Sequence, residues 1–414
     1  MKFKNVIHQL THLPNEIYWS IVVFVGSALL FTWRLSNGAL LNTTRGEQVV
    51  IGQIARQANL WNNLSGLNGL YFSLGHLTYF LYGSITGARL ASVIIGLCSV
   101  MLVYWVVSSW HGYRVALLAA AIFATNLSVL ALSRHATPLV SQLWLGASLI
   151  TGMVIIRRQH NYSGLLAWLL LGALDLYIPG AVLLVVAYII LNLTELRLTL
   201  ADVKGFWRKL TPFLITIIAI APMAIGFMRS YSRHYLAIYL GYRLHGPLLT
   251  ALKQYGTNLI NVPSDLFIRS SGFSPSYVLG HQPFLALADT LIIAVAVYVY
   301  ITRIKDKRWR YVLTFTGLIW LMAAFGVLRP FAILPLTAIA AGTGMAYLLR
   351  EWYVVFPRNP IARFGGIGLM SIVILFACIY SGRSYYVAWY NNPKTLLRFN
   401  IQTPVVTGKT SHRQ

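Results

Sequence analysis

Apolar runs about as long as a bilayer core is thick recur along this chain from Tyr18 to Tyr380. A helix that crosses the hydrocarbon core needs about 20 consecutive apolar residues. Only 10% of the residues are charged and 57% are hydrophobic, whereas soluble domains carry roughly 25% charged residues. No stretch alternates polar and apolar residues over a barrel strand's length, so helices must satisfy the backbone in lipid. The sequence therefore predicts an all-α polytopic membrane protein.

About eleven spans fit this pattern, in one transmembrane domain over residues 1–381 with an external tail at 382–414. The apolar run 163–193 is too long for one comfortable span, and Pro179-Gly180 offers a break between two. The first run follows Lys2 and Lys4 without a convincing cleavage site, so it is interpreted as a retained span. The predicted spans are 18–36, 87–108, 114–133, 138–156, 163–178, 179–193, 211–228, 284–301, 311–328, 330–349 and 365–381.

The distribution of basic residues predicts the orientation. The short loops RRQH and RIKDKRWR are strongly basic, which is typical of cytoplasmic loops. Both are cytoplasmic only if 163–193 crosses twice and the N-terminus lies inside. We therefore expect a multi-pass protein of a prokaryotic cell membrane. Two long external stretches follow, at 37–86, with membrane-surface helices, and at 229–283.

The external face is also predicted to be basic, because Glu47 and Asp265 are the only acids assigned to it. Fixed arginines at a membrane surface suit phosphate or anionic headgroups. Ordinary adhesion to anionic lipid is the alternative. The basic residues are spread over both membrane faces, so the pI of 10.2 does not indicate a nucleic-acid partner.

Four segments in order resemble the GT-C superfamily of polyprenyl-phosphate-sugar-dependent glycosyltransferases, nearest the protein mannosyltransferase and aminoarabinose transferase branch (family 39-like). That branch has an Asp-Glu pair at the start of a surface helix, and the corresponding segment here is NTTRGEQVVIGQIARQANLW. Glu47 matches the second acid, and Gly46 replaces the first. The segment from LTYFLYGSITGARL to Arg134 looks like the second and third spans. The family's broken fifth and sixth spans are similar to LLGALDLYIPGAVLLVVAYII. Its late external Arg and the span that follows are similar to LRPFAILPLTAIAAGTGMAYLL. The resemblance covers about residues 15–350.

The resemblance implies transfer of a sugar from a polyprenyl-phosphate donor to an extracytoplasmic lipid, glycan or protein. Such a reaction needs a carboxylate to accept the proton and positive groups to bind the departing phosphate. The family's usual base is the Asp that Gly46 replaces, so Glu47 is the predicted catalytic residue. Alternatively, Glu47 pairs with Arg45 or Arg56, or stabilises the start of its helix.

Basic residues near the outer surface are the predicted donor ligands. Arg329, held before Pro330, corresponds to the family's late external Arg, and a snorkelling arginine is its alternative. The turn SRHATP carries two more candidates. RSYSRHY interleaves basic residues with tyrosines, which suits phosphate and sugar, or an interfacial aromatic belt. The predicted substrate-binding set is Arg45, Arg134, His135, Arg229, Arg233, His234 and Arg329.

Asp175 and Asp265 are the candidate secondary acids. Asp175 lies within a predicted span, where an ionisable group is costly, and is a candidate partner for Arg134. Asp265 follows Pro263 and is expected in a turn. Two external acids are too few for a divalent-metal cluster, so we predict no metal and no cofactor. Cys98 and Cys378 show no ligand or redox spacing and are interpreted as packing residues.

Two other classes of function stay open. The absence of the family's Asp favours a catalytically silent member that binds lipid-linked sugar or scaffolds envelope assembly. A lipid or sugar transporter ranks last, because transporters tend to show repeated halves with matched broken helices. Only one broken pair is visible here.

Overall fold

The computed structural model describes residues 15–33, 35, 44–56, 60–229, 248–270, 277–393 and 395. Every regular element in these ranges is a helix. The all-α prediction is therefore confirmed for this part of the chain. The predicted ligands Arg233 and His234 lie outside the described residues.

Five described helical segments are long and apolar enough to cross a bilayer, or up to seven if each bent pair is one span. One bent pair is α7 (Tyr113–Thr125) with α8 (Leu127–Arg134), and the other is α11 (Val182–Leu191) with α12 (Leu193–Asp202). Shorter apolar helices include most of α2 (Asn15–Thr32), α10 (Tyr162–Leu176) and α16 (Leu287–Thr302). The count of eleven spans stays a prediction. The five segments are α6 (Ile85–His111), η1 (Pro138–Val140) with α9 (Ser141–Arg158), α13 (Phe206–Arg229), η2 (Pro330–Ile333) with α18 (Leu334–Val355), and α19 (Pro360–Arg383) with η3 (Ser384–Trp389).

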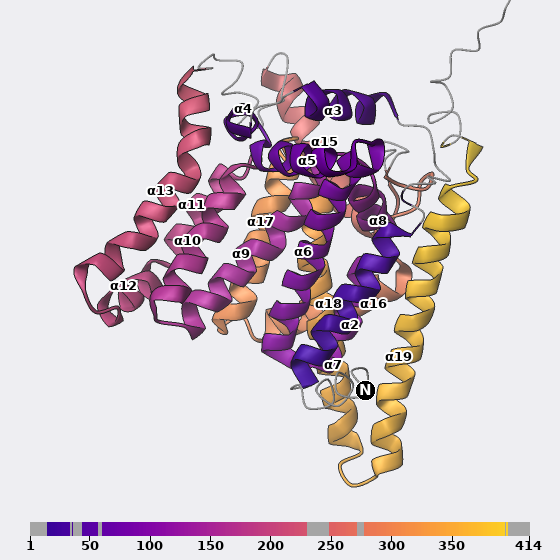
Figure 1. Ribbon diagram of the computed structural model, residues 1–414. Coiled ribbons are helices and arrows are strands. Elements are labelled where there is room, and N and C mark those ends of the chain that lie inside the picture. The colour runs from indigo at the N-terminus through magenta and orange to yellow at the C-terminus, as the bar shows by residue number, and fades with distance from the viewer. Residues whose placement is uncertain are drawn as a thin grey trace, which may run out of the picture.

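Three helices between α2 and α6 form a layer at one end of the bundle. They are α3 (Arg45–Arg56), α4 (Leu60–Leu64) and α5 (Gly69–Tyr82). Figure 1 shows α3 and α5 lying across the upper ends of the upright helices. Buried Ile54 of α3 packs on Gly75 of α5, where a Cβ would come within 2.8 Å of the Ile54 side chain. Helices α3 and α5 of this layer are thus packed closely on each other.

Small residues bring the central helices together. Gly96 of α6 faces Ser133 of α8, and Gly342 of α18 faces Val107 of α6. Without a hydrophobic force between helices in lipid, such close approach supplies the packing energy. Helices α6, α8, α9 and α18 accordingly contain many of the buried residues.

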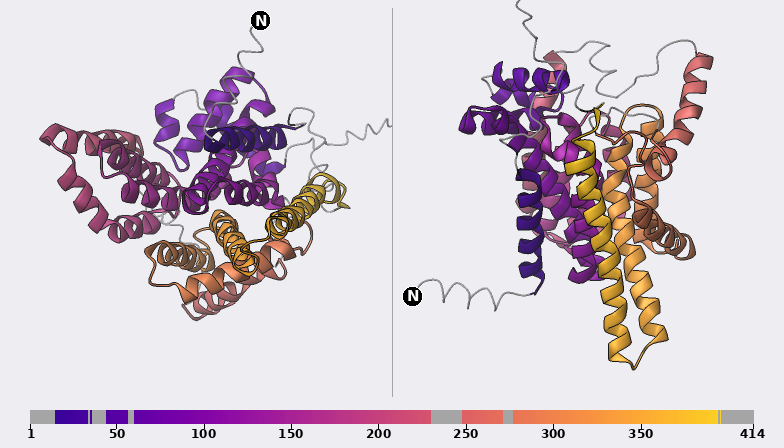
Figure 2. Two further views of the ribbon diagram at one scale, coloured as in Figure 1. Left: turned by 90° about the horizontal axis from the view of Figure 1, so that it is seen from below. Right: turned by 90° about the vertical axis from the view of Figure 1, so that its right-hand side faces the viewer.

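The chain changes direction at Pro179-Gly180, between α10 and α11, where Gly180 has a φ of +87°. Only glycine adopts such a φ without a steric penalty. Helix α17 (Lys307–Ala324) precedes η2, and α18 and α19 form a hairpin whose lower end extends past the other helices (Figure 2). In the predicted external tail, Ser384–Trp389 continue α19 as η3.

Two local predictions are wrong. Asp265 lies inside the helix α15 (Leu248–Phe267), which also contains Pro263, rather than in a turn. Proline within a helix removes one hydrogen bond but does not always end the helix. Cys98 is exposed on α6 instead of packed in the interior, whereas half-buried Cys378 packs against the core as expected.

Candidate functional site

The Glu47 side chain points from α3 into the bundle, where it forms a buried ion pair. Its carboxylate accepts two hydrogen bonds from Arg89, from Nε to Oε1 at 2.8 Å and from Nη2 to Oε2 at 3.1 Å. Oε1 also accepts from the backbone N–H of Ala136 at 3.0 Å. Nδ1 of His135 lies 3.7 Å from Oε2. Groups from α3, α6 and the turn after α8 therefore converge on one carboxylate.

The local sequence explains why Glu47 points inward. Thr44 caps α3, accepting a hydrogen bond at its Oγ1 from the Glu47 N–H at 3.1 Å. This Thr-x-x-Glu spacing is that of a capping box. Instead of turning back to the cap, the Glu47 side chain reaches Arg89, 42 residues away. The alternative partners Arg45 and Arg56 make no ion pair with it among the described residues.

The surroundings keep Glu47 ionised. Burial alone raises the pKa of a carboxylic acid, since it disfavours the charged form. The hydrogen bonds and charges of His135 and Arg89 outweigh burial and lower the pKa of Glu47 to about 2. Three of roughly four acceptor positions on its oxygens are also occupied. Glu47 is therefore a fixed negative charge and a weak proton acceptor.

Arg134 forms the neighbouring part of the cluster. Its Nη1 donates to the Leu30 carbonyl at 3.1 Å and to the Tyr386 hydroxyl at 2.8 Å. The guanidinium also lies over the rings of Tyr385 and Tyr386, 5.5 Å and 5.0 Å from their centroids. These contacts join the ends of α2, α8 and η3. Arg134 is thus a buried positive charge held between aromatic rings, at the same end of the bundle as α3.

His135 lies between Glu47 and an aromatic wall. It follows α8 in an extended conformation, and its ring is 5.7 Å from that of Trp389. Trp389 in turn stacks on Tyr385 at 5.0 Å. The imidazole is almost fully buried. Glu47, Arg134 and His135 therefore lie in one cluster.

A chain of hydroxyl groups extends the cluster under α5. The Tyr71 hydroxyl lies 3.1 Å from the Ser92 hydroxyl, which accepts from the Thr137 N–H at 3.4 Å. Burial and the charge of Glu47 are among the causes that raise the pKa of Tyr71 above its ordinary value. Tyr71 therefore stays neutral and can donate to an oxygen of a bound molecule.

The other predicted ligands occupy different places. Arg329 precedes η2, and its backbone N–H donates to Oε1 of Gln142 at 3.0 Å. Arg45 begins α3 and Arg229 ends α13, and both are exposed. In the part of the chain that the structure describes, no ion pair brings these three arginines to Glu47.

The secondary acids lie apart from Glu47. The carboxylate of Asp175, fully buried in α10, accepts hydrogen bonds from Ser148 at 2.8 Å. The suggested pair with Arg134 is absent, since Arg134 bonds to α2 and η3 instead. Asp265 is buried in α15. The described residues contain no group of three His, Cys, Asp or Glu that could hold a metal ion.

Two apolar cavities flank the cluster. The larger, about 610 Å³, lies between the segment 277–288 and α19, and Ser384, next to Tyr385, lines its edge. The other, about 220 Å³, lies under α5 and is lined by Tyr71, Trp144 and Tyr177 among others. Both can take apolar chains.

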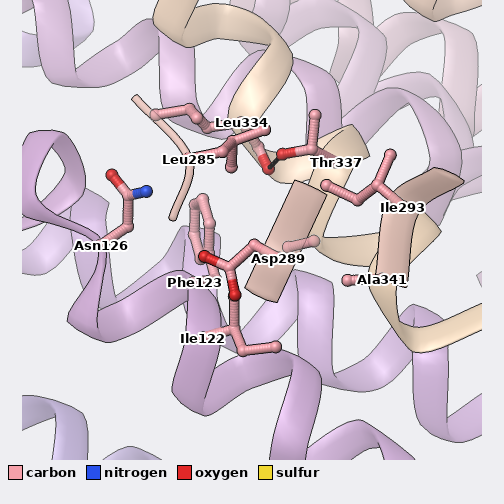
Figure 3. Close-up of a pocket in the computed structure, with 10 residues that line it drawn as sticks. Ile122, Phe123, Asn126, Leu285, Asp289, Ile293, Leu334, Thr337 and Ala341 are labelled. Atoms are coloured by element: carbon pink, nitrogen blue, oxygen red, sulfur yellow. Dashed lines mark hydrogen bonds between the residues drawn. The ribbon is translucent and has the colours of Figure 1, made fainter. Parts of the chain in front are cut away.

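A third, water-sized cavity of about 10 Å³ lies deeper, beside Asp289. Figure 3 shows the Asp289 carboxylate beside Ile122 and Phe123. This cavity is too small for a sugar, so it is not part of the candidate site.

Comparison of the fold with solved structures gives two clear similarities. ArnT from Cupriavidus metallidurans bound to undecaprenyl phosphate matches with a TM-score of 0.53 at 14% identity, over 92% of this chain and 77% of that chain. The archaeal oligosaccharyltransferase AglB from Archaeoglobus fulgidus, in complex with an inhibitory peptide and a dolichol-phosphate, matches with a TM-score of 0.52 at 14% identity, over 89% and 56%. This chain therefore has the same fold as these two proteins.

A sequence comparison also finds relatives of this chain. The chain is 30% identical over 164 residues to an undecaprenyl phosphate-alpha-4-amino-4-deoxy-L-arabinose arabinosyl transferase of Pectobacterium atrosepticum. The match spans 37% of this chain and 29% of that relative. A relative of the same description from Pectobacterium carotovorum matches to the same extent. No family model matches the chain.

Two contributors to the site were missed from the sequence. Arg89 appeared in the sequence only within the segment LTYFLYGSITGARL, although a fully buried arginine is rare unless it is paired. Tyr386 belonged to the tail and carried no signal of its own. The one clue to the Glu47–Arg89 pair was that both residues were expected at the membrane surface, in segments that lie next to each other.

Proposed function

We propose that this chain is a membrane glycosyltransferase that moves a sugar from a polyprenyl-phosphate donor to an acceptor outside the cytoplasm. The buried Glu47–Arg89 pair beneath α3, in a chain of GT-C fold, carries this proposal. The named activity of the curated relative and the undecaprenyl phosphate bound to a protein of the same fold support it. The acceptor is a lipid, a glycan or a protein.

The donor phosphate is proposed to bind at the aromatic-held arginine. Arg134 offers a planar guanidinium, which suits phosphate oxygens, and Tyr386 adds a hydroxyl beside it. The large apolar cavity is lined in part by Ser384, next to Tyr385, and would take the polyprenyl chain. Arg45, Arg229, Arg233, His234 and Arg329 remain proposed ligands at the outer surface.

Glu47 is proposed to act on the acceptor proton through its neighbours. With a pKa of about 2 it holds a proton poorly at neutral pH, but its carboxylate lies 3.7 Å from Nδ1 of His135 and can orient that ring. A carboxylate orients the histidine base of hydrolytic triads in the same way. In this arrangement His135 accepts the proton that the family's missing Asp would take. Asp175 and Asp265 are the reserve candidates for that role.

The working face is proposed to be extracytoplasmic, with the N-terminus in the cytoplasm of a prokaryotic cell. Basic loops at the opposite end of the bundle, including Arg303–Arg310, support this orientation. The surface layer of α3 and α5 would then lie at the outer membrane surface (Figure 1).

Release of polyprenyl phosphate from lipid-linked sugars by the purified protein tests the proposal. We expect turnover by the wild type, a loss of at least about 100-fold in Glu47→Gln and His135→Gln, and wild-type rates in Glu351→Gln, an exposed acid on α18. Because Glu47→Gln also removes a buried ion pair, its thermal unfolding is measured in parallel. His135→Gln, which leaves the Glu47–Arg89 pair intact, separates catalysis from stability. Full activity in both variants would contradict the assignment.

A catalytically silent, lipid-binding member is the second candidate. Gly46, at the place of the family's base, and the weak basicity of Glu47 favour it. This function predicts tight binding of the lipid-linked sugar without turnover for any acceptor. A transporter would instead move the intact donor across a vesicle membrane.

A further inference from the structure

A polar cavity of about 310 Å³ lies at the end of the bundle away from α3 and α5. It is formed by the α11–α12 bend and the beginning of α17, which Figure 1 shows toward the lower half of the molecule. Its charged lining residues are Lys307, Arg310 and Glu195. Hydroxyl groups complete the polar lining, from Thr194, Tyr311 and Thr314.

The charges of this cavity do not cancel. Glu195 is shared between two cations, Lys307 Nζ at 3.5 Å and Arg157 Nε at 3.6 Å. Arg157 also lies over the Tyr311 ring, 4.4 Å from its centroid, which holds it against the cavity wall. Arg310 makes no ion pair with any residue in the described part of the chain. Two cations thus line the cavity with one acid, and Arg157, outside the lining, also pairs with that acid, so the cavity attracts an anion.

An apolar surface leads directly into the cavity. Leu183, Val186 and Ile190 are exposed on α11 with the spacing of one helix face. Leu191, on the next position, lines the cavity itself. At Asn192 the chain bends by 60° into α12, so the polar cavity begins where the apolar face ends. A ligand that follows this surface has an apolar chain joined to an anionic head.

We propose that this cavity binds the phosphate headgroup of an anionic phospholipid from the leaflet opposite the Glu47 cluster. The phosphate oxygens accept hydrogen bonds from Arg310, Lys307 and the threonine hydroxyls, and the acyl chains lie along α11. General attraction of basic loops to a membrane needs neither a cavity nor hydroxyl groups. The proposed lipid site has both a cavity and hydroxyl groups. It does not depend on the proposed transfer reaction.

Binding of phosphatidylglycerol to the full-length protein in detergent, measured by native mass spectrometry, tests the proposal. Arg310→Gln is expected to weaken binding at least about tenfold, since a charge-assisted bond to phosphate is lost. Arg308→Gln is the matched control: it removes the same charge two residues away, where Arg308 is exposed, outside the cavity and 3.9 Å from Asp306. Glu195→Gln is expected to tighten binding, because the cavity loses its one acid.

Several results would overturn the site. Equal weakening in Arg308→Gln and Arg310→Gln would show attraction by total charge alone. Equal binding of phosphatidylcholine would show that no anionic head is selected, and equally tight binding of glycerol phosphate would show a soluble ligand instead. Thermal unfolding without lipid identifies a misfolded variant, and Lys307→Gln then replaces Arg310→Gln. Loss of lipid binding with unchanged sugar transfer would leave the proposed enzymatic function intact.

Discussion

Glu47→Gln is the most informative single change, because it removes the charge of a buried ion pair and keeps the side chain's shape. A pKa lowered from 4.5 to about 2 means that folding favours the ionised form by about 3 kcal/mol at neutral pH. An independent estimate agrees, since removing one partner of a buried pair costs about 3–5 kcal/mol. Most of this cost comes from Arg89, which the amide leaves buried without a compensating charge.

The pH dependence gives this prediction a distinct signature. The folded-state pKa of Glu47 is depressed, so its stabilisation is complete above about pH 4.5 and is lost as the pH falls toward 2. We therefore expect the free energy of unfolding, measured in mixed detergent micelles, to differ by about 3 kcal/mol between wild type and Glu47→Gln at pH 7. That difference should shrink steadily below pH 4.5.

Glu351→Gln is the control, because Glu351 is an exposed acid on α18 and should change stability by less than about 0.5 kcal/mol. A Glu47→Gln protein as stable as the wild type would refute the reasoning. So would a stability difference that stays constant from pH 7 to pH 2, since the effect would then not come from the carboxylate charge.

Two further predictions concern packing around the site. Tyr386→Phe should lower the free energy of unfolding by about 1–2 kcal/mol, because the Leu30 carbonyl loses the hydroxyl that donates to it at 2.5 Å; thermal unfolding measures the loss, and an unchanged midpoint would contradict it. Gly96→Ala should cost about 1–3 kcal/mol, since its Cβ would overlap the Ser133 side chain. Gly52→Ala, in an open position of α3, should instead stabilise by up to about 1 kcal/mol; chemical denaturation of both variants distinguishes local overlap from a general effect of replacing glycine.

The acid at the start of a surface helix could be found from the sequence, but its partner could not. Local spacing offered Arg45 and Arg56, which lie near Glu47 along α3. The structure selects Arg89, because the Glu47 side chain turns toward the bundle and meets the Arg89 guanidinium of α6 at 2.8 Å. Long-range pairs of this kind depend on which helix faces abut, and one sequence does not encode that in any short pattern.

The partners and local structure of the buried acids Asp175 and Asp265 could not be predicted from the sequence either. Asp175 was correctly recognised as unusual within an apolar run, but its suggested partner was an arginine, whereas a serine hydroxyl from α9 serves both of its oxygens. Asp265 was expected in a turn because Pro263 precedes it, yet α15 continues through the proline. Local propensity yields to tertiary packing in such cases.

The repeated apolar runs by themselves determined that this chain is helical and suited to a membrane, because lipid leaves the backbone almost no other way to pair its polar groups. The order of spans and surface helix also sufficed to indicate the GT-C fold, which the structural similarity supports. Only the tertiary structure decided that Glu47, Arg89, Arg134 and His135 share one cluster and that Glu47 is held as a fixed charge. The physical reason is that periodicity sets which residues are apolar and helical, whereas a site depends on contacts between helices that are far apart in sequence.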